Sequence, residues 1–302
     1  MTKKYILTVT LNPALDKISS RGRVLISAGG KGINVARALE SLGLKTCSMG
    51  FLGGTSGKIL KNILRKEGLN SDFVSIQGET RINVTMENPR TLVKERFLSL
   101  GPKLHKSEIE QFKEKYIQLL SKSYGVVFSG RNALGASPSF YAHLVKLARE
   151  ANIPTVVDTS GVPLELALKA KPWMIKPNLM EAEEVLGRKL NTKVLLKQAL
   201  RQFHRLGVEI VLLSLGNKGA VGSNGKEMWL VQAPKIKVKN EVGCGDAMVA
   251  GFLFAYLKND SFYEIMKCAV AAGTSNGLSL TPGAIDQRAL GGILKRVQIK
   301  EL

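Results

Sequence analysis

The clearest chemistry in this sequence lies in residues 240–253, Asn-Glu-Val-Gly-Cys-Gly-Asp-Ala-Met-Val-Ala-Gly-Phe-Leu. Gly243 and Gly245 can adopt backbone conformations closed to other residues, and the apolar run after Asp246 predicts a buried helix over 246–257. The first turn of such a helix exposes N–H groups that bind anions and should keep Asp246 ionised at pH 7. A carboxylate beside an anion site suits phosphoryl transfer to a hydroxyl, with Asp246 accepting the proton. A glycine turn capped by an aspartate would use the same residues without catalysis.

Further polar side chains stand near the ends of expected strands, where open α/β sheets bind ligands. They are Asp16 after the first strand, Lys31 and Asn34 in a glycine-rich helix start, Arg81 before a hairpin, Arg131 after strand 124–129, and Lys176 and Asn178 at the end of strand 173–176. Each alone has an ordinary explanation as a turn cap, a helix-end hydrogen bond or a surface charge. Together with Asp246 they predict a single site for an anionic ligand.

Strands and helices alternate along most of the chain, which predicts a largely parallel sheet covered by helices. The expected strands are 5–11, 45–51, 72–76, 124–129, 154–158, 173–176 and 208–213, and the expected helices lie within 28–43 and at 56–67, 107–121, 138–151, 179–186, 192–206, 246–257, 261–279 and 287–296. Residues 81–87 and 92–98 predict a hairpin outside this sheet, and 219–223 with 227–232 predict an antiparallel pair. No linker marks a second domain, so 1–302 is expected to form one unit.

The composition limits the classes of function. The chain has 302 residues and a net charge of +20. Its Lys and Arg residues are spread along helices and not clustered as in nucleic-acid binders, so part of this charge is expected to attract anionic ligands. No apolar run reaches membrane-spanning length, and three widely spaced cysteines match no metal or disulfide pattern. We therefore expect a cytoplasmic protein with no nucleic-acid or membrane partner.

Two blocks resemble the signatures of the PfkB (ribokinase-like) sugar kinases. Residues 28–37, Ala-Gly-Gly-Lys-Gly-Ile-Asn-Val-Ala-Arg, resemble the N-terminal signature, and residues 242–251, Val-Gly-Cys-Gly-Asp-Ala-Met-Val-Ala-Gly, resemble the C-terminal one. The blocks 10–16, 157–161, 175–179 and 213–216 follow the family's order. Within the family, the branch of 1-phosphofructokinases and tagatose-6-phosphate kinases is the most similar to block 10–16, Thr-Leu-Asn-Pro-Ala-Leu-Asp, and to residues 176–178, Lys-Pro-Asn. The resemblance implies a three-layer α/β/α fold with a mostly parallel central sheet and a small β lid.

The resemblance also implies a role for each matching residue. Asp246 matches the catalytic base, and the amides of Gly243, Cys244 and Gly245 match its anion hole. The other matches are Asp16, Gly30, Lys31 and Asn34 for sugar hydroxyls, Arg81 and Arg131 for the sugar phosphate, Lys176, Asn178, Ser214, Gly216, Gly219, Gly243 and Gly245 for the nucleotide, and Asn178 and Glu181 for a metal ion held through water. The implied cofactors are ATP and Mg²⁺, with a monovalent cation as a further candidate.

Segments 17–28 and 81–98 match the lid, which in this branch often also forms a homodimer contact. The stretch between Asp16 and Gly29 is shorter than in relatives, so we expect a shortened lid: either Arg21 and Arg23 replace the missing basic residues, or the lid is truncated. In the C-terminal signature, Cys244 stands for the usual alanine and Ala247 for a small hydroxyl residue, and both changes keep the volume small.

The leading hypothesis is ATP-dependent phosphorylation of a ketohexose phosphate to the bisphosphate. Fructose 1-phosphate, fructose 6-phosphate and tagatose 6-phosphate are the candidate substrates. A kinase of an unphosphorylated sugar or nucleoside is the alternative within the family, but it would leave Arg81 and Arg131 without an anion to pair with. A weakly active protein that senses sugar phosphates, and a nucleic-acid binder suggested by charge alone, are the alternatives from other classes.

Overall fold

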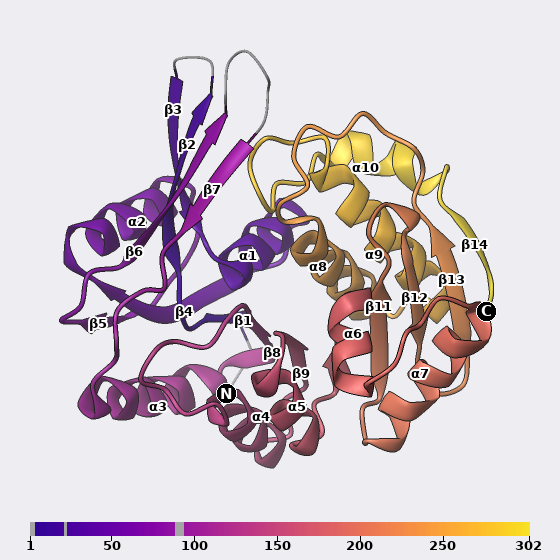
Figure 1. Cartoon of the computed structure of the whole chain (residues 1–302), viewed down its shortest axis with the longest axis horizontal. Coiled ribbons are helices and arrows are strands. Elements are labelled where there is room, and N and C mark those ends of the chain that lie inside the picture. The colour runs from indigo at the N-terminus through magenta and orange to yellow at the C-terminus, as the bar shows by residue number, and fades with distance from the viewer. Residues whose placement is uncertain (1–3, 21–22, 88–93) are drawn as a thin grey trace.

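The computed structural model describes residues 4–20, 23–87 and 94–302 (Figure 1). Its largest element is a ten-stranded sheet. In their order across the sheet, the strands are β14 (Gln298–Glu301), β13 (Met228–Gln232), β12 (Ala220–Ser223), β11 (Ile210–Ser214), β10 (Met174–Ile175), β9 (Thr155–Asp158), β8 (Ser123–Ser129), β1 (Tyr5–Thr10), β4 (Thr46–Gly53) and β5 (Val74–Ile76). Neighbours from β5 to β11 run parallel, and β11 to β14 run antiparallel.

Helices cover both faces of this sheet, so the molecule has three layers (Figure 1). One face carries α3 (Lys106–Leu120), α4 (Phe140–Glu150), α5 (Val162–Lys169), α6 (Leu179–Leu186) and α7 (Lys193–Arg205), and the other carries α1 (Lys31–Ser41), α8 (Cys244–Leu257), α9 (Phe262–Asn276) and α10 (Gln287–Leu294). The strands are apolar on both faces: Leu7 belongs to the first layer's core, whereas Ile6 belongs to the second. This is the expected pattern for strands buried between two helical layers.

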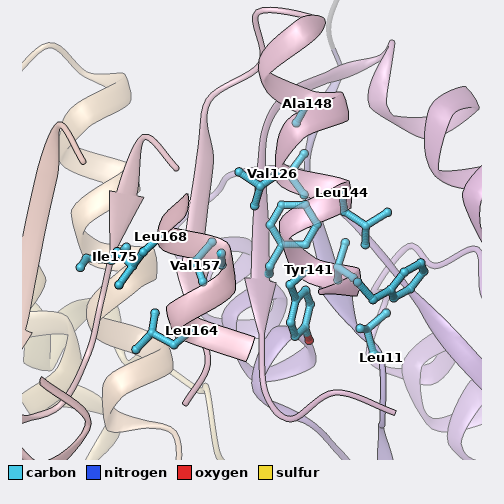
Figure 2. Close-up of a cluster of buried hydrophobic side chains, with 14 of the residues drawn as sticks. Leu11, Val126, Tyr141, Leu144, Ala148, Val157, Leu164, Leu168 and Ile175 are labelled. Carbon is cyan, nitrogen blue, oxygen red and sulfur yellow. The ribbon is translucent and has the colours of Figure 1, made fainter. Parts of the chain in front are cut away.

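The first core shows how helix spacing creates a buried face. Tyr141, Leu144, Val145 and Ala148 recur on one side of α4 and are fully buried against the sheet. Figure 2 shows Tyr141, Leu144 and Ala148 beside strand residues such as Val126. Burying each large aliphatic side chain contributes about 1.5–3 kcal/mol to stability, so this layer holds the strands firmly in place.

A second, four-stranded sheet has the order β3 (Arg23–Gly29), β2 (Ala14–Ser20), β6 (Arg81–Glu87) and β7 (Lys94–Leu98). β2 pairs with β3 along its whole length, from Ala14–Gly29 to Ser20–Arg23. The ranges expected to form a lid fall in this sheet, which packs against α2 (Gly54–Lys66) through a small apolar cluster. Arg21, the side chain of Arg23 and the Asn88-Pro89-Arg90 connection lie outside the described residues.

Most predicted elements are present, with a few differences. α5 and β14 were not predicted, because α5 is short and contains Pro163 in its first turn, and β14 has a single strongly apolar residue, Ile299. α8 begins at Cys244, two residues before the predicted start. In the described part of the chain, no helix is both long and apolar enough to cross a membrane.

Candidate active site

Several of the predicted site residues lie at one edge of the large sheet. β1, β8, β9, β10 and β11 run parallel, so their carboxyl ends share this edge. The chain starts at β1 in the middle and extends the sheet first toward β5 and later toward β11, and such a switch of direction is where open α/β sheets bind ligands. Asp158 ends β9, Lys176 directly follows β10 and Ser214 ends β11.

α8 begins at this edge with a tight glycine turn. Gly243 has a φ of 86°, and a Cβ added there would lie 2.7 Å from the backbone nitrogen of Gly283, so only glycine fits. Within the described residues, the amides of Gly245 and Asp246 have no acceptor, as expected for a first helical turn. The amide of Cys244, which was also expected to bind an anion, already donates a long bond of 3.4 Å to the carbonyl of Glu241.

A buried ammonium group lies over this turn. A Cβ added to Gly245 would be 3.3 Å from Lys176 Nζ, which is also 3.3 Å from Asp158 Oδ1. The same oxygen is 3.1 Å from Lys31 Nζ at the start of α1. Burial by itself would raise the pKa of Asp158, but the two lysines outweigh it and hold the pKa below its ordinary value. One carboxylate therefore fixes two cations beside the anion-binding amides.

Asp246 lies within the same charge group. Its side chain is buried, and its Oδ2 accepts a hydrogen bond of 2.8 Å from Asn34 Nδ2. Burial and the nearby charge of Asp158 raise the pKa of Asp246 to about 6, against the opposing effects of Lys31, Asn34 and Lys176. At neutral pH Asp246 is mostly ionised and is more basic than an ordinary aspartate. Both properties suit a general base.

Two buried residues that sequence reasoning missed hold these groups in position. Asn276 accepts from Gly283 N at 2.6 Å and donates to Val242 O at 2.9 Å and to Cys244 Sγ at 3.4 Å, so it fixes the glycine turn. Burial raises the pKa of Cys244, which keeps its thiol neutral. No local pattern could have identified Asn276, because it stands after Thr274 and Ser275 at the end of an alanine-rich helix, where a polar residue before a glycine is ordinary.

Arg37 is the second residue. Its Nη1 donates to Asn34 Oδ1 at 3.3 Å and to Pro282 O at 2.6 Å. It therefore orients the amide that contacts Asp246 and ties that amide to the segment held by Asn276. Glu67 balances its charge through bonds of 3.0 and 2.9 Å.

Asp16 extends from β2 over the start of α1. A Cβ added to Gly29 would lie 2.0 Å from Asp16 Oδ2, so the carboxylate needs glycine beneath it. Asn83 Nδ2 donates to Asp16 Oδ1 at 2.8 Å. Burial raises the pKa of Asp16, although the bond from Asn83 and nearby arginines oppose the shift. Gly30 follows with a φ of 134° and allows the chain to enter α1.

Arg81 is anchored between the small sheet and the loop after β1. Its Nε donates to Asn12 O at 3.1 Å and its Nη1 to Ser99 O at 3.0 Å, while Nη2 has no partner within the described structure. Burial lowers the pKa of Arg81, Asp16 opposes this, and the positive charge of Arg131 lowers it further. The two guanidinium groups thus lie within electrostatic reach of each other, which suits a multiply charged anion.

The residues expected to bind a nucleotide follow β10 and β11. Asn178 caps α6 in a reciprocal pair with Glu181: the Asn178 side chain accepts from Glu181 N at 2.9 Å, and Glu181 Oε2 accepts from Asn178 N at 2.8 Å. The backbones of Asn178 and Ser214 form a bridge. Gly216 and Gly219 shape the next turn with φ values of 62° and 103°. No described contact joins this turn to Asp246.

The pKa of Asp246 leads to a testable pH dependence. We expect kcat/KM to rise with pH through a midpoint near 6 and then to level off, because only the ionised carboxylate accepts a proton. An aspartate with the ordinary pKa of 3.8 would give a flat profile between about pH 5 and pH 8. Steady-state rates across that range distinguish the two cases, and a flat profile would contradict the assignment.

The arrangement can bind an anion at the α8 turn and can accept a proton beside it. These are the two operations needed to move a phosphoryl group to a hydroxyl. The fold and the site together define a phosphotransferase acting on an alcohol group.

Comparison with known proteins supports this enzyme class. The pfkB family carbohydrate kinases match residues 7–276, and the chain belongs to this family, which confirms the predicted fold and kinase class. A tagatose-6-phosphate kinase of Staphylococcus epidermidis is 33% identical over 313 aligned positions, covering 98% of this chain and all of the relative. Phosphofructokinase-2 from Escherichia coli, solved in complex with potassium, has a TM-score of 0.90 at 27% identity and covers 98% and 99% of the two chains. A possible 1-phosphofructokinase from Thermotoga maritima has a TM-score of 0.89 at 28% identity and covers 99% of both.

Proposed function

We propose that the protein transfers a phosphoryl group from ATP to a hydroxyl of a ketohexose phosphate and so forms a bisphosphate. The observation that carries this proposal is the grouping of Asp246, with its pKa near 6, the free amides of the α8 turn and the ammonium of Lys176. The names of the relatives support a phosphorylated ketohexose as the acceptor. Fructose 1-phosphate, fructose 6-phosphate and tagatose 6-phosphate are the candidates.

In this proposal each group has one task. Asp246 takes the proton from the sugar hydroxyl as its oxygen attacks, and Asn34 holds the carboxylate in position. The amides of Gly245 and Asp246, with Lys176, stabilise negative charge on the phosphoryl group in transit. Lys31 and Asp16 bind sugar hydroxyls beside the glycines of α1.

Asn178 and Glu181 are proposed to bind a magnesium ion through water. The capping pair leaves Glu181 Oε1 without a hydrogen-bond partner among the described residues, and because Asn178 is exposed and Glu181 is partly exposed, water can reach both side chains. Among the described residues, no three acidic, histidine or cysteine side chains are grouped to hold a metal directly, which fits an ion that arrives with the nucleotide. When bound, Mg²⁺ neutralises oxygens between the second and third phosphates. Rates measured in potassium and in sodium would test the further candidate, a monovalent cation.

Substrate class is tested through Arg81. Arg81→Ala should raise the KM for the phosphosugar about tenfold or more, because a charge-assisted bond to phosphate contributes roughly 1.5–3 kcal/mol. Arg81→Lys keeps the charge but loses the planar fork, so its effect should be intermediate. ADP release is measured with the three phosphosugars and with free fructose and tagatose, on the unmodified protein and both variants.

The free sugars are the control. If Arg81→Ala impairs them as strongly as the phosphosugars, Arg81 only supports the loop at Asn12 and Ser99, and the phosphate assignment is wrong. If free sugar is already the better substrate of the unmodified protein, the enzyme phosphorylates a neutral acceptor.

A homodimer formed through the small sheet is a further part of the proposal. Val24 on β3 and Phe97 and Leu98 on β7, the two edge strands of this sheet, are exposed by 65, 56 and 59%, and Leu100 just after β7 is exposed by 71%. Exposed apolar patches of this kind mark protein contacts. Light scattering at micromolar concentration should give the mass of a dimer, and a monomeric mass would count against it.

A further inference from the structure

A second cationic cavity lies away from the candidate active site. It has a volume of about 450 Å³ and is lined by α7, by the turn between β12 and β13 and by the end of β14. Its lining includes Lys197, Arg201, His204, Arg205, Lys226 and Glu301. The β12–β13 turn lies at the opposite end of β12 from Gly219, so this cavity is separate from the nucleotide turn.

The charges in this cavity are unbalanced. Lys197, Arg201 and Arg205 repeat every four residues along α7, so they project from the same face of the helix. Like charges at this spacing destabilise a helix, and in the described structure none of the three forms an ion pair or a side-chain hydrogen bond. Lys226 adds a fourth positive charge from the facing turn. Glu301 offsets only part of this charge.

Hydrogen bonds on both ring nitrogens fix His204 in position between these cations. His204 Nδ1 lies 2.8 Å from Val208 O, which can only accept, so this nitrogen carries the proton. The other ring nitrogen lies 2.8 Å from Ser223 Oγ, which in turn accepts from Gly225 N at 3.1 Å. Both ring nitrogens therefore take part in hydrogen bonds that hold the β12–β13 turn against α7. The imidazole has a structural role between the charged side chains.

We propose that this cavity is a binding site for a small anion that carries two or more phosphate groups. Such a ligand would relieve the repulsion along α7, and two arginines and two lysines on facing elements can contact separate phosphate groups. A nucleoside triphosphate, a sugar bisphosphate and inorganic pyrophosphate share this chemistry. The site does not depend on the function proposed above.

The test monitors amides that border the cavity, so that pyrophosphate bound at the candidate active site is not mistaken for pyrophosphate bound in the cavity. The ¹⁵N-labelled full chain is titrated with pyrophosphate at low ionic strength, and the amide signals of Gly225 and Lys226 are monitored. Arg201→Gln/Arg205→Gln removes two charges from the cavity. Lys58→Gln/Lys61→Gln removes two exposed charges from α2 and is the matched control.

We expect saturable shifts of both signals in the unmodified protein. The cavity variant should weaken the apparent affinity about tenfold or more, whereas the control should change it by about twofold or less. The cavity variant should fold, because it relieves like-charge repulsion along α7. Lys226→Gln provides an independent test, because it removes a charge from the β12–β13 turn and leaves α7 unchanged. Parallel titrations with ATP and with fructose 1,6-bisphosphate identify which source of phosphate groups binds more tightly.

Three results would overturn the proposal. The first is the absence of saturable shifts at Gly225 and Lys226. The second is equal weakening by the cavity variant and the α2 control, which would mean that pyrophosphate senses only the overall positive charge. The third is displacement of pyrophosphate by a short oligonucleotide that binds more tightly, which would make this face a nucleic-acid surface.

Discussion

Asp246→Asn is expected to lower turnover by about two to four orders of magnitude, the usual contribution of a general base. The substitution removes the proton acceptor but keeps the size of the side chain and an oxygen that can accept from Asn34. ADP release with the preferred phosphosugar measures the effect. ATP binding should change little, because the amides of Gly245 and Asp246 remain in place. Near-normal turnover would show that another group accepts the proton.

The melting temperature of Asp246→Asn serves as the control for correct folding of this variant. The raised pKa of Asp246 means that the folded protein binds this proton more tightly than the unfolded chain. The stability that goes with the proton is fully present below the unfolded pKa and is lost as pH rises through about 6. Asparagine does not ionise, so Asp246→Asn should melt at a higher temperature than the unmodified protein at about pH 8. Lower activity together with higher stability would exclude misfolding as the cause.

Lys176→Gln should have the second largest effect, a fall in kcat of about 10²–10³, the range measured when one preorganised oxyanion donor is removed. Its ammonium is buried over the Gly245 turn, where it can stabilise charge that develops only during transfer. KM for the sugar should change less than kcat, because Lys176 contacts none of the sugar-binding residues proposed above. Single-turnover rates separate the chemical step from product release.

Lys31→Gln is the matched comparison, because Lys31 and Lys176 share Asp158 Oδ1. Both positive charges lower the pKa of Asp246, so both variants should move the pH midpoint upward. Only Lys176→Gln should show the large fall in kcat at a pH above both midpoints. If the two variants lose kcat equally there, Lys176 has no special role at the anion-binding turn.

The sequence predicted the elements whose signals are local. The helix at 28–43 was identified from glycines at both ends and apolar spacing between them, and α1 occupies Lys31–Ser41. Asp246 was identified because its glycines and apolar run are adjacent in the chain. Its raised pKa could not be predicted, since it depends on burial and on Asp158, a residue 88 positions earlier by number whose location near α8 follows only from the sheet order.

Asp158 illustrates which contacts cannot be predicted from the sequence alone. Its block, Val157-Asp-Thr-Ser-Gly, was noted as part of a resemblance, but nothing in the block shows that the carboxylate pairs with two lysines. Lys31 lies far earlier in the chain and Lys176 lies beyond a helix. Only the parallel order of β8, β9 and β10, together with the packing of α1 against β1 and β8, brings all three together. Long-range ion pairs and buried amides such as Asn276 are properties of the packed molecule.

The hydrogen bond between Asn34 and Asp246 joins residues 212 positions apart, which has a consequence during synthesis. At about 5–20 residues per second, the ribosome adds Asp246 roughly ten to forty seconds after Asn34. Until then the nascent chain has the residues proposed to bind the sugar but neither the proposed base nor the glycine turn at the start of α8. α8 is buried along residues 246–253, with α1 and α9 packed against it. A nascent chain in which α8 has been synthesised but α9 has not therefore exposes an apolar helix, and exposed apolar surface of this kind makes a partly folded chain prone to aggregation.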